Sequence, residues 1–193
     1  METFDCSKLG MGLQAVVCGK PPVAGTGSKV ILLNYSEIDR NLSVVADNVI
    51  TALVLKQQAT GYEFRGLDNS NLGATTLNKG TYMSNFQHDL TLRIFAKNEA
   101  SKKFANSLNG ARVVAIVQNK EQGDNGSVKW ECYGWDAGLE LNEFESNTEM
   151  ADSVVYQILL GSGENSKESS LPKSVFSTDL TTTETMLDGL IAE

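Results

Sequence analysis

The sequence contains few of the side chains that perform chemistry. It has one histidine, His88, and three widely spaced cysteines, Cys6, Cys18 and Cys132. A zinc site needs paired spacing such as C-x-x-C, and a nucleophilic serine, threonine or cysteine needs a base beside it. The odd number of cysteines argues for reduced thiols and against a disulfide framework. The composition therefore favours a protein that is not an enzyme and that holds no metal or cofactor.

Long hydrophobic runs are also missing. No stretch approaches the roughly 20 apolar residues that a membrane-spanning helix needs. The first five residues, from Met1 to Asp5, lack the positive and apolar regions of a secretion signal. We therefore expect synthesis in a cytoplasm and no membrane partner. The chain does have 193 residues, of which 41% are hydrophobic, and that is enough for a buried core.

Charge is distributed unevenly along the chain. Residues 1–119 hold 12 basic and 9 acidic side chains, whereas residues 120–193 hold 4 basic and 15 acidic ones. Proteins that read duplex DNA neutralise phosphates with clustered Lys and Arg, and this acidic chain does not fit that class. Opposite charge on two ends of a molecule favours head-to-tail stacking of its copies. An asymmetry without functional meaning is the alternative.

The hydrophobic pattern is that of a β protein. Residues 86–96 alternate, so that Phe86, His88, Leu90, Leu92 and Ile94 share one strand face. Further strands are expected at residues 29–35, 44–55, 111–118, 127–134, 137–145 and 154–160. Because strands and helices do not alternate, a parallel doubly wound sheet is not expected. The expected fold is mainly β, an antiparallel barrel or sandwich with extended loops and arms.

One flanking helix is expected at residues 98–109. Asn98 is a suitable N-cap, Gly110 suits the position after the last turn, and Phe104 and Leu108 belong to an apolar stripe. The rest of the chain divides into a β domain, residues 1–161, and a C-terminal arm, residues 162–193. A long polar loop at residues 56–85 projects from the β domain, either as a loose excursion or as a hairpin ordered by a neighbouring copy.

The C-terminal arm is expected to end in a short helix. Thr181 and Glu184 have the spacing of a capping box, and an apolar stripe with Leu187 and Leu190 follows. A helix of this length is marginal on its own in water. It must therefore dock, either on its own barrel or on the next copy.

Three possible chemical sites are weak. Residues 25–29 resemble a phosphate-binding loop, but the order of Ser28 and Lys29 is wrong and a strand follows instead of a helix. His88 lies on an apolar strand face, so a core or interface histidine is favoured over a catalytic base. Glu140, Glu143 and Glu145 could supply a glycosidase pair, but their spacing fits a solvated strand better.

Two stretches resemble the C-terminal part of tail tube proteins from tailed phages. They are residues 130–141 (WECYGWDAGLEL), in which an aromatic-Gly pair is followed by a turn and Gly-Leu, and residues 151–160 (ADSVVYQILL), a final apolar strand. The segment Leu171-Pro172-Lys173 is similar too, and the resemblance covers about residues 111–175. It implies a virion structural protein whose copies join sheets edge to edge into rings, commonly hexameric, that stack into a tube conducting DNA.

The resemblance also suggests which residues meet other copies. Contacts between rings are expected at positions in the long loops and the terminal helix: Lys20, Pro21, Pro22, Asp68, Asn69, Asn71, Lys79, Leu187 and Leu190. Glu131, Glu140 and Asn142 are expected to line the channel, where negative charge would repel phosphate and let DNA pass without specific binding. The partners would be further copies and other virion tail proteins, with no small-molecule substrate.

Two other classes stay open at this point. The same build would suit a head–tail connector ring or a capsid decoration protein. It would also suit a β-sandwich that binds a small ligand or a carbohydrate, or a cryptic hydrolase that uses His88 or Glu140.

Overall fold

The computed structural model describes residues 23–80, 84–146, 154–163 and 167–191. These residues form eleven strands in one sheet, two α-helices and two short 3-10 helices. The strands are β1 (Thr26–Asn34), β2 (Val44–Ala46), β3 (Val49–Ala52), β4 (Tyr62–Arg65), β5 (Leu72–Lys79), β6 (Ser84–Ile94), β7 (Val113–Asn119), β8 (Trp130–Tyr133), β9 (Leu139–Ser146), β10 (Tyr156–Ser162) and β11 (Lys173–Val175). The helices are α1 (Glu99–Leu108) and α2 (Leu180–Asp188), with 3-10 turns at Tyr35–Glu37 and Asp124–Gly126.

The sheet is open. Its strands follow the order β2-β3-β11-β8-β7-β9-β10-β6-β5, and β1 joins β7 to β4 off this path. All pairs are antiparallel except β11 with β3, which is parallel. The prediction of a mainly β, largely antiparallel fold is confirmed, but the sheet does not close into a barrel.

The pair of β1 and β7 lies at the centre, because both of its faces are buried. Val30 and Leu32 of β1 face one hydrophobic core with β6, β9, β10 and α1. Ile31 and Leu33 of the same strand face a second core with β3, β8, β11 and α2. A strand buried on both faces has a continuous apolar sequence instead of an alternating one. That is why residues 29–35 contain the run Val-Ile-Leu-Leu.

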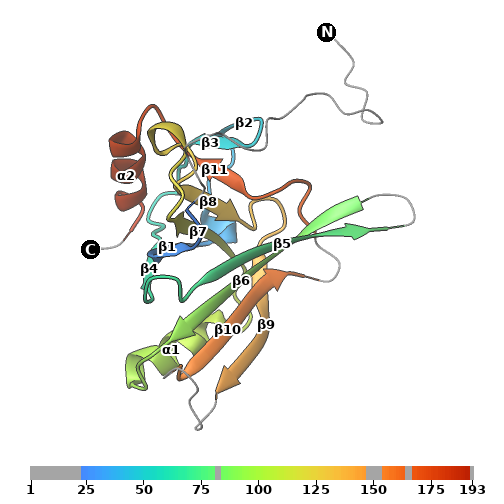
Figure 1. Ribbon diagram of the computed structural model, residues 1–193, viewed down its shortest axis with the longest axis vertical. Helices are drawn as coiled ribbons and strands as arrows, with labels where there is room; N and C mark the ends of the chain where they lie inside the picture. The colour runs from blue at the N-terminus through green and yellow to red at the C-terminus, as the bar shows by residue number, and fades with distance from the viewer. Residues whose placement is uncertain (1–22, 81–83, 147–153, 164–166, 192–193) are drawn as a thin grey trace.

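The C-terminal segment belongs to the second core. β11 lies between β3 and β8 in the sheet (Figure 1), and its Val175 is fully buried. Leu187 of α2 is 1% exposed, and Leu190, two residues after the end of this helix, is 8% exposed; both belong to the chain's own second core. The expectation that these two leucines contact another ring is wrong, because the helix docks on its own domain.

Two expected segments differ in detail from the structure. Residues 44–55 form two short strands, β2 and β3, because the chain turns at Asp47, which has a positive φ of 52°. The described residues of the range 56–85 are not a loose excursion: β4 pairs with β1, and β5 pairs with β6 along its whole length. The β5–β6 hairpin extends away from the body of the molecule (Figure 1).

Helix α1 has the expected start, and α2 does not. The Asn98 side chain accepts a hydrogen bond from the Ser101 amide, and the Ser101 hydroxyl oxygen accepts one from the Asn98 amide. In α2 the N-cap is Asp179, which accepts from the Thr182 amide, so Thr181 lies inside the helix. Glu184 pairs with Lys129 at 2.6 Å and makes no capping box.

The burial of α2 gives a testable prediction. Leu187→Ala should lower the free energy of unfolding of the isolated chain by about 2–5 kcal/mol, because it leaves a cavity in a packed core. The matched control is Leu77→Ala, at a half-exposed position of β5. It should lower the free energy of unfolding by much less than Leu187→Ala does. Urea denaturation of the two variants measures both. Equal, small losses would mean that α2 does not belong to this core.

Candidate functional site

The expected contact residues fall into three groups: some lie outside the described residues, some are exposed, and three, Asn71, Leu187 and Leu190, are buried. Lys20, Pro21 and Pro22 lie outside the described residues. Asp68 and Lys79 are exposed, the first in the turn between β4 and β5 and the second at the end of β5. Asp68 lies 3.5 Å from the Lys120 ammonium group, so this turn is tied to its own domain.

Two neighbouring asparagines in that turn have different surroundings. Asn69 is exposed at a positive φ of 61°, and its amide donates to the Thr26 carbonyl. Asn71 is only 3% exposed, and its own carbonyl accepts a hydrogen bond from the Thr26 hydroxyl at 2.6 Å. The expectation that Asn71 meets another copy is therefore wrong. Its role is to hold the turn against the first residue of β1.

Three described strands have an edge that pairs with no other strand. Among the described strands, β5 pairs only with β6, β4 only with β1, and β2 only with β3. The exposed large apolar side chains include Val44 on β2, Tyr62 on β4 and Leu72 and Leu77 on β5. An unpaired edge with apolar side chains is a template for another strand, and proteins ordinarily protect such edges. Here the β5 edge is eight residues long.

The outer face of β9 carries a row of acidic side chains. In the register with β10, Glu140 lies opposite Gly161, Glu143 opposite Leu159 and Glu145 opposite Gln157. A bulge between the Leu159 and Leu160 pairs shifts the alternation. Strict alternation would place Glu143 and Glu145 with Leu141, but the bulge brings them to the face of Glu140. Sequence alone could not locate this shift.

The expected channel-lining residues are only partly brought together. Glu140 and Asn142 are exposed on β9, as the alternation predicts, and Leu139 and Leu141 point into the first core. Glu131 is separate from them. It lies half-buried on β8 and accepts a hydrogen bond from the Tyr133 hydroxyl at 3.2 Å. Glu131 therefore does not belong to the acidic row.

His88 is a buried structural histidine. Its side chain is 1% exposed, with Nε2 3.0 Å from the Ser170 carbonyl oxygen and Nδ1 accepting from the Gly134 amide at 3.2 Å. Burial lowers the pKa of His88, so the neutral ring is favoured. Both ring nitrogens are occupied by backbone groups. The ring therefore has no free nitrogen with which to act as a base.

Glu168 completes the same buried polar cluster. Its carboxylate accepts hydrogen bonds from the Asp136 amide at 2.8 Å and the Ala137 amide at 2.7 Å. Burial raises the pKa of Glu168, while these two hydrogen bonds oppose the rise. The loop that supplies the amides begins and ends with Gly134 and Gly138, both at positive φ. Sequence reasoning missed Glu168, because it stands in a serine-rich segment without a hydrophobic pattern.

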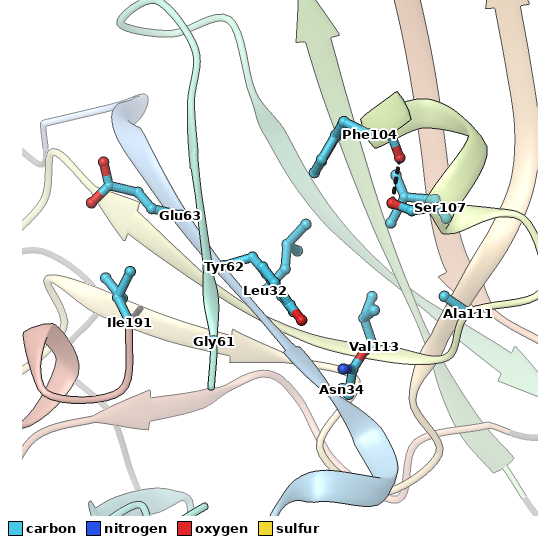
Figure 2. Close-up of a pocket in the computed structure, with 11 residues that line it drawn as sticks. Leu32, Asn34, Gly61, Tyr62, Glu63, Phe104, Ser107, Ala111, Val113 and Ile191 are labelled. Carbon is cyan, nitrogen blue, oxygen red and sulfur yellow. Dashed lines mark hydrogen bonds between the residues drawn. The ribbon is translucent and has the colours of Figure 1, made fainter. Parts of the chain in front are cut away.

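One cavity of about 530 Å³ opens beside β4 (Figure 2). Its walls come from β1, β4, α1 and the start of β7, with Leu32, Phe104 and Val113 among the apolar side chains that line it. Asn34, Glu63 and Ser107 add polar groups.

The described residues contain no cluster of three or more His, Cys, Asp or Glu side chains that could hold a metal ion. In the same part of the chain, no helix has the length and apolarity to cross a membrane.

Comparisons with known proteins do not assign a family. No family matches the chain, no curated protein is similar to it, and no solved structure matches its fold. The resemblance to tail tube proteins therefore remains a prediction from the sequence.

The buried histidine predicts a pH dependence of stability. Because the pKa of His88 is lowered in the folded state, the unfolded chain takes up the proton first as pH falls through about 6.5. The free energy of unfolding should then fall by up to about 1.4 kcal/mol per pH unit. His88→Gln should lose this slope, as measured by urea denaturation at pH 7.5 and 5.5.

Glu168 provides the control for that measurement. Its pKa is raised, so it contributes in the opposite sense: the folded chain takes up the proton first and gains stability as pH falls towards about 4.5. Glu168→Gln should therefore steepen the loss of stability on acidification. A wild-type slope that His88→Gln leaves unchanged would contradict the assignment to His88.

Proposed function

We propose that this protein is a virion structural protein that assembles with copies of itself into rings, as a component of a phage tail tube, without a catalytic step. The observation that carries the proposal is the open sheet. A well-packed domain with two hydrophobic cores leaves the edge of β5 unpaired over eight residues. Pairing between copies would cover this edge and protect it from aggregation.

The acidic row on β9 supports the tube in particular. Glu140, Glu143 and Glu145 follow one another on the outer face of a sheet, where exposed side chains could face a channel. The Arg112 guanidinium lies 3.8 Å from the Glu140 carboxylate. A channel lined by these carboxylates repels the phosphates of passing DNA, and the repulsion weakens as salt is added.

The location of the polar groups also favours assembly over catalysis. The single histidine and the buried Glu168 form hydrogen bonds with backbone groups of neighbouring loops and so hold these loops in place.

The interface of an obligate assembly typically buries more than about 2,000 Å². The β5–β6 hairpin, which extends from the body, and the neighbouring sheet faces supply surface for such an interface (Figure 1).

Electron microscopy of the purified protein tests the proposal, with a strand-edge variant as the probe. Thr76→Lys places a charge on the exposed edge of β5, opposite Gln87 of β6. We expect rings or tubes from the wild type and none from Thr76→Lys, because a lysine on an edge strand opposes pairing with another strand. The free energy of unfolding of the variant should stay within about 0.5 kcal/mol of the wild type.

The matched control is Thr185→Lys on the exposed surface of α2. It introduces the same charge away from any strand edge and should leave the rings intact. A wild-type protein that stays strictly monomeric at high concentration would overturn the proposal. Loss of rings in both variants would show that net charge, and not the β5 edge, governs assembly.

A further inference from the structure

The cavity beside β4 follows an open strand edge. Tyr62 and Glu63 are neighbours on β4, so their side chains point to opposite faces of the sheet, yet both line the cavity. Ile191 borders it on the side of the second core and Phe104 on the side of the first. The cavity therefore runs along the outer edge of β4. The chain's own C-terminal segment covers the start of this edge, where the Gly61 amide donates to the Leu190 carbonyl at 2.6 Å. Beyond Gly61, no described strand pairs with the outer edge of Tyr62–Arg65. Figure 2 shows these side chains around β4 and β1.

The chemistry of this edge suits an uncharged, apolar occupant. Leu32 and Val113 lie on adjacent strands and contribute apolar surface with Phe104. The one carboxylate in the lining, Glu63, is neutralised: Lys29 lies 3.3 Å from it, and the Arg65 guanidinium donates a hydrogen bond to it. A charged occupant would have to leave water without gaining a free partner. An extended apolar segment could bond to the β4 backbone and fill the cavity with alternate side chains.

The chain contains one segment with these properties that the described structure does not include. Residues 9–19 (LGMGLQAVVCG) carry no charge and are bounded by Lys8 and Lys20. Within them Leu13, Ala15 and Val17 fall on one face of an extended strand. This segment is uncharged and apolar, as the cavity lining requires. Its apolar residues also alternate with the two-residue period of an extended strand that could pair with β4.

The reach of the chain favours a segment from another copy. The Val23 amide donates to Glu121, near the first residues of β1, whereas the cavity lies beside Leu32 and Asn34 at the other end of that strand. At about 3.3 Å per residue of strand, the distance from Val23 to the cavity is roughly 30 Å. The 6–10 residues between Val23 and residues 13–17 span at most about 35 Å. A chain would have to run almost straight to reach its own cavity.

We propose that residues 9–19 of a neighbouring copy add as a strand to the outer edge of β4 and place alternate apolar side chains in the cavity. This contact links copies by a route separate from the β5 edge, and it rests on the proposed self-assembly. It also gives the N-terminal segment a partner of defined chemistry, which is the β4 backbone above an apolar floor.

Thiol crosslinking tests this contact. In a Cys6→Ser background, Tyr62→Cys places a thiol at the cavity, and the native Cys18 supplies the second thiol at the end of the segment. Cys132 is buried, and burial raises the pKa of its thiol, so it should not react. A short bismaleimide crosslinker applied to the assembled protein should give covalent dimers and longer ladders on a denaturing gel.

Matched variants separate this contact from chance crosslinking. Glu145→Cys in place of Tyr62→Cys puts an exposed thiol on β9, away from the cavity, and should give at least tenfold less ladder. Adding Leu13→Asp to the Tyr62→Cys protein should lower the yield at least tenfold, because the carboxylate would have to enter the apolar cavity. Gln14→Asp, on the other face of the same strand, should leave the yield within about twofold of the parent, since its charge would stay in water.

The outcomes distinguish this inference from the proposed function. A ladder that depends on Leu13 supports the inference. A product crosslinked only within one chain would overturn it in favour of the chain's own segment. Rings in the microscope without a ladder would overturn the inference and leave the proposed function standing. Neither rings nor a ladder would overturn both.

Discussion

The burial of β1 and β7 on both faces is the constraint on which the rest of the structure depends. Each residue along β1 from Val30 to Leu33 enters one of two cores, so neither side of this pair can face water. One core must be covered by β6, β9, β10 and α1, and the other by β3, β8, β11 and α2. Fully burying a side chain of this size contributes about 1.5–3 kcal/mol. The two cores together therefore fix where every layer lies.

In this arrangement both hydrophobic cores are packed, whereas several strand edges are left unpaired. Because α2 and β11 fill the second core from within the chain, this core needs no second copy for its burial. What stays open is backbone along β5, β4 and β2, together with the cavity beside β4. A domain that is stable alone and unpaired at its edges can be made as a monomer and later join others without refolding. This property supports the proposed assembly.

Sequence reasoning succeeded where one local pattern decided the structure. The two-residue period placed His88 and Leu90 on the inner face of β6, and the Asn98 cap fixed the start of α1. It failed where distant contacts decided. Leu187 is buried because β11 carries α2 back onto the sheet, and Glu168 is buried because amides from another loop bind it. The bulge in β9 leaves no mark in the sequence, so Glu143 and Glu145, although expected on a solvated strand, were not placed on the same face as Glu140.

Hydrogen exchange of the backbone amides, compared between isolated and assembled protein, tests the central claim that open edges are completed by other copies. Amides of β1 and β7 should exchange slowly in both states, because two cores cover them. Amides on the outer edge of β5 should exchange fast in the isolated chain and slowly in the assembly. Slow exchange along β5 in a protein that is strictly monomeric would contradict the account.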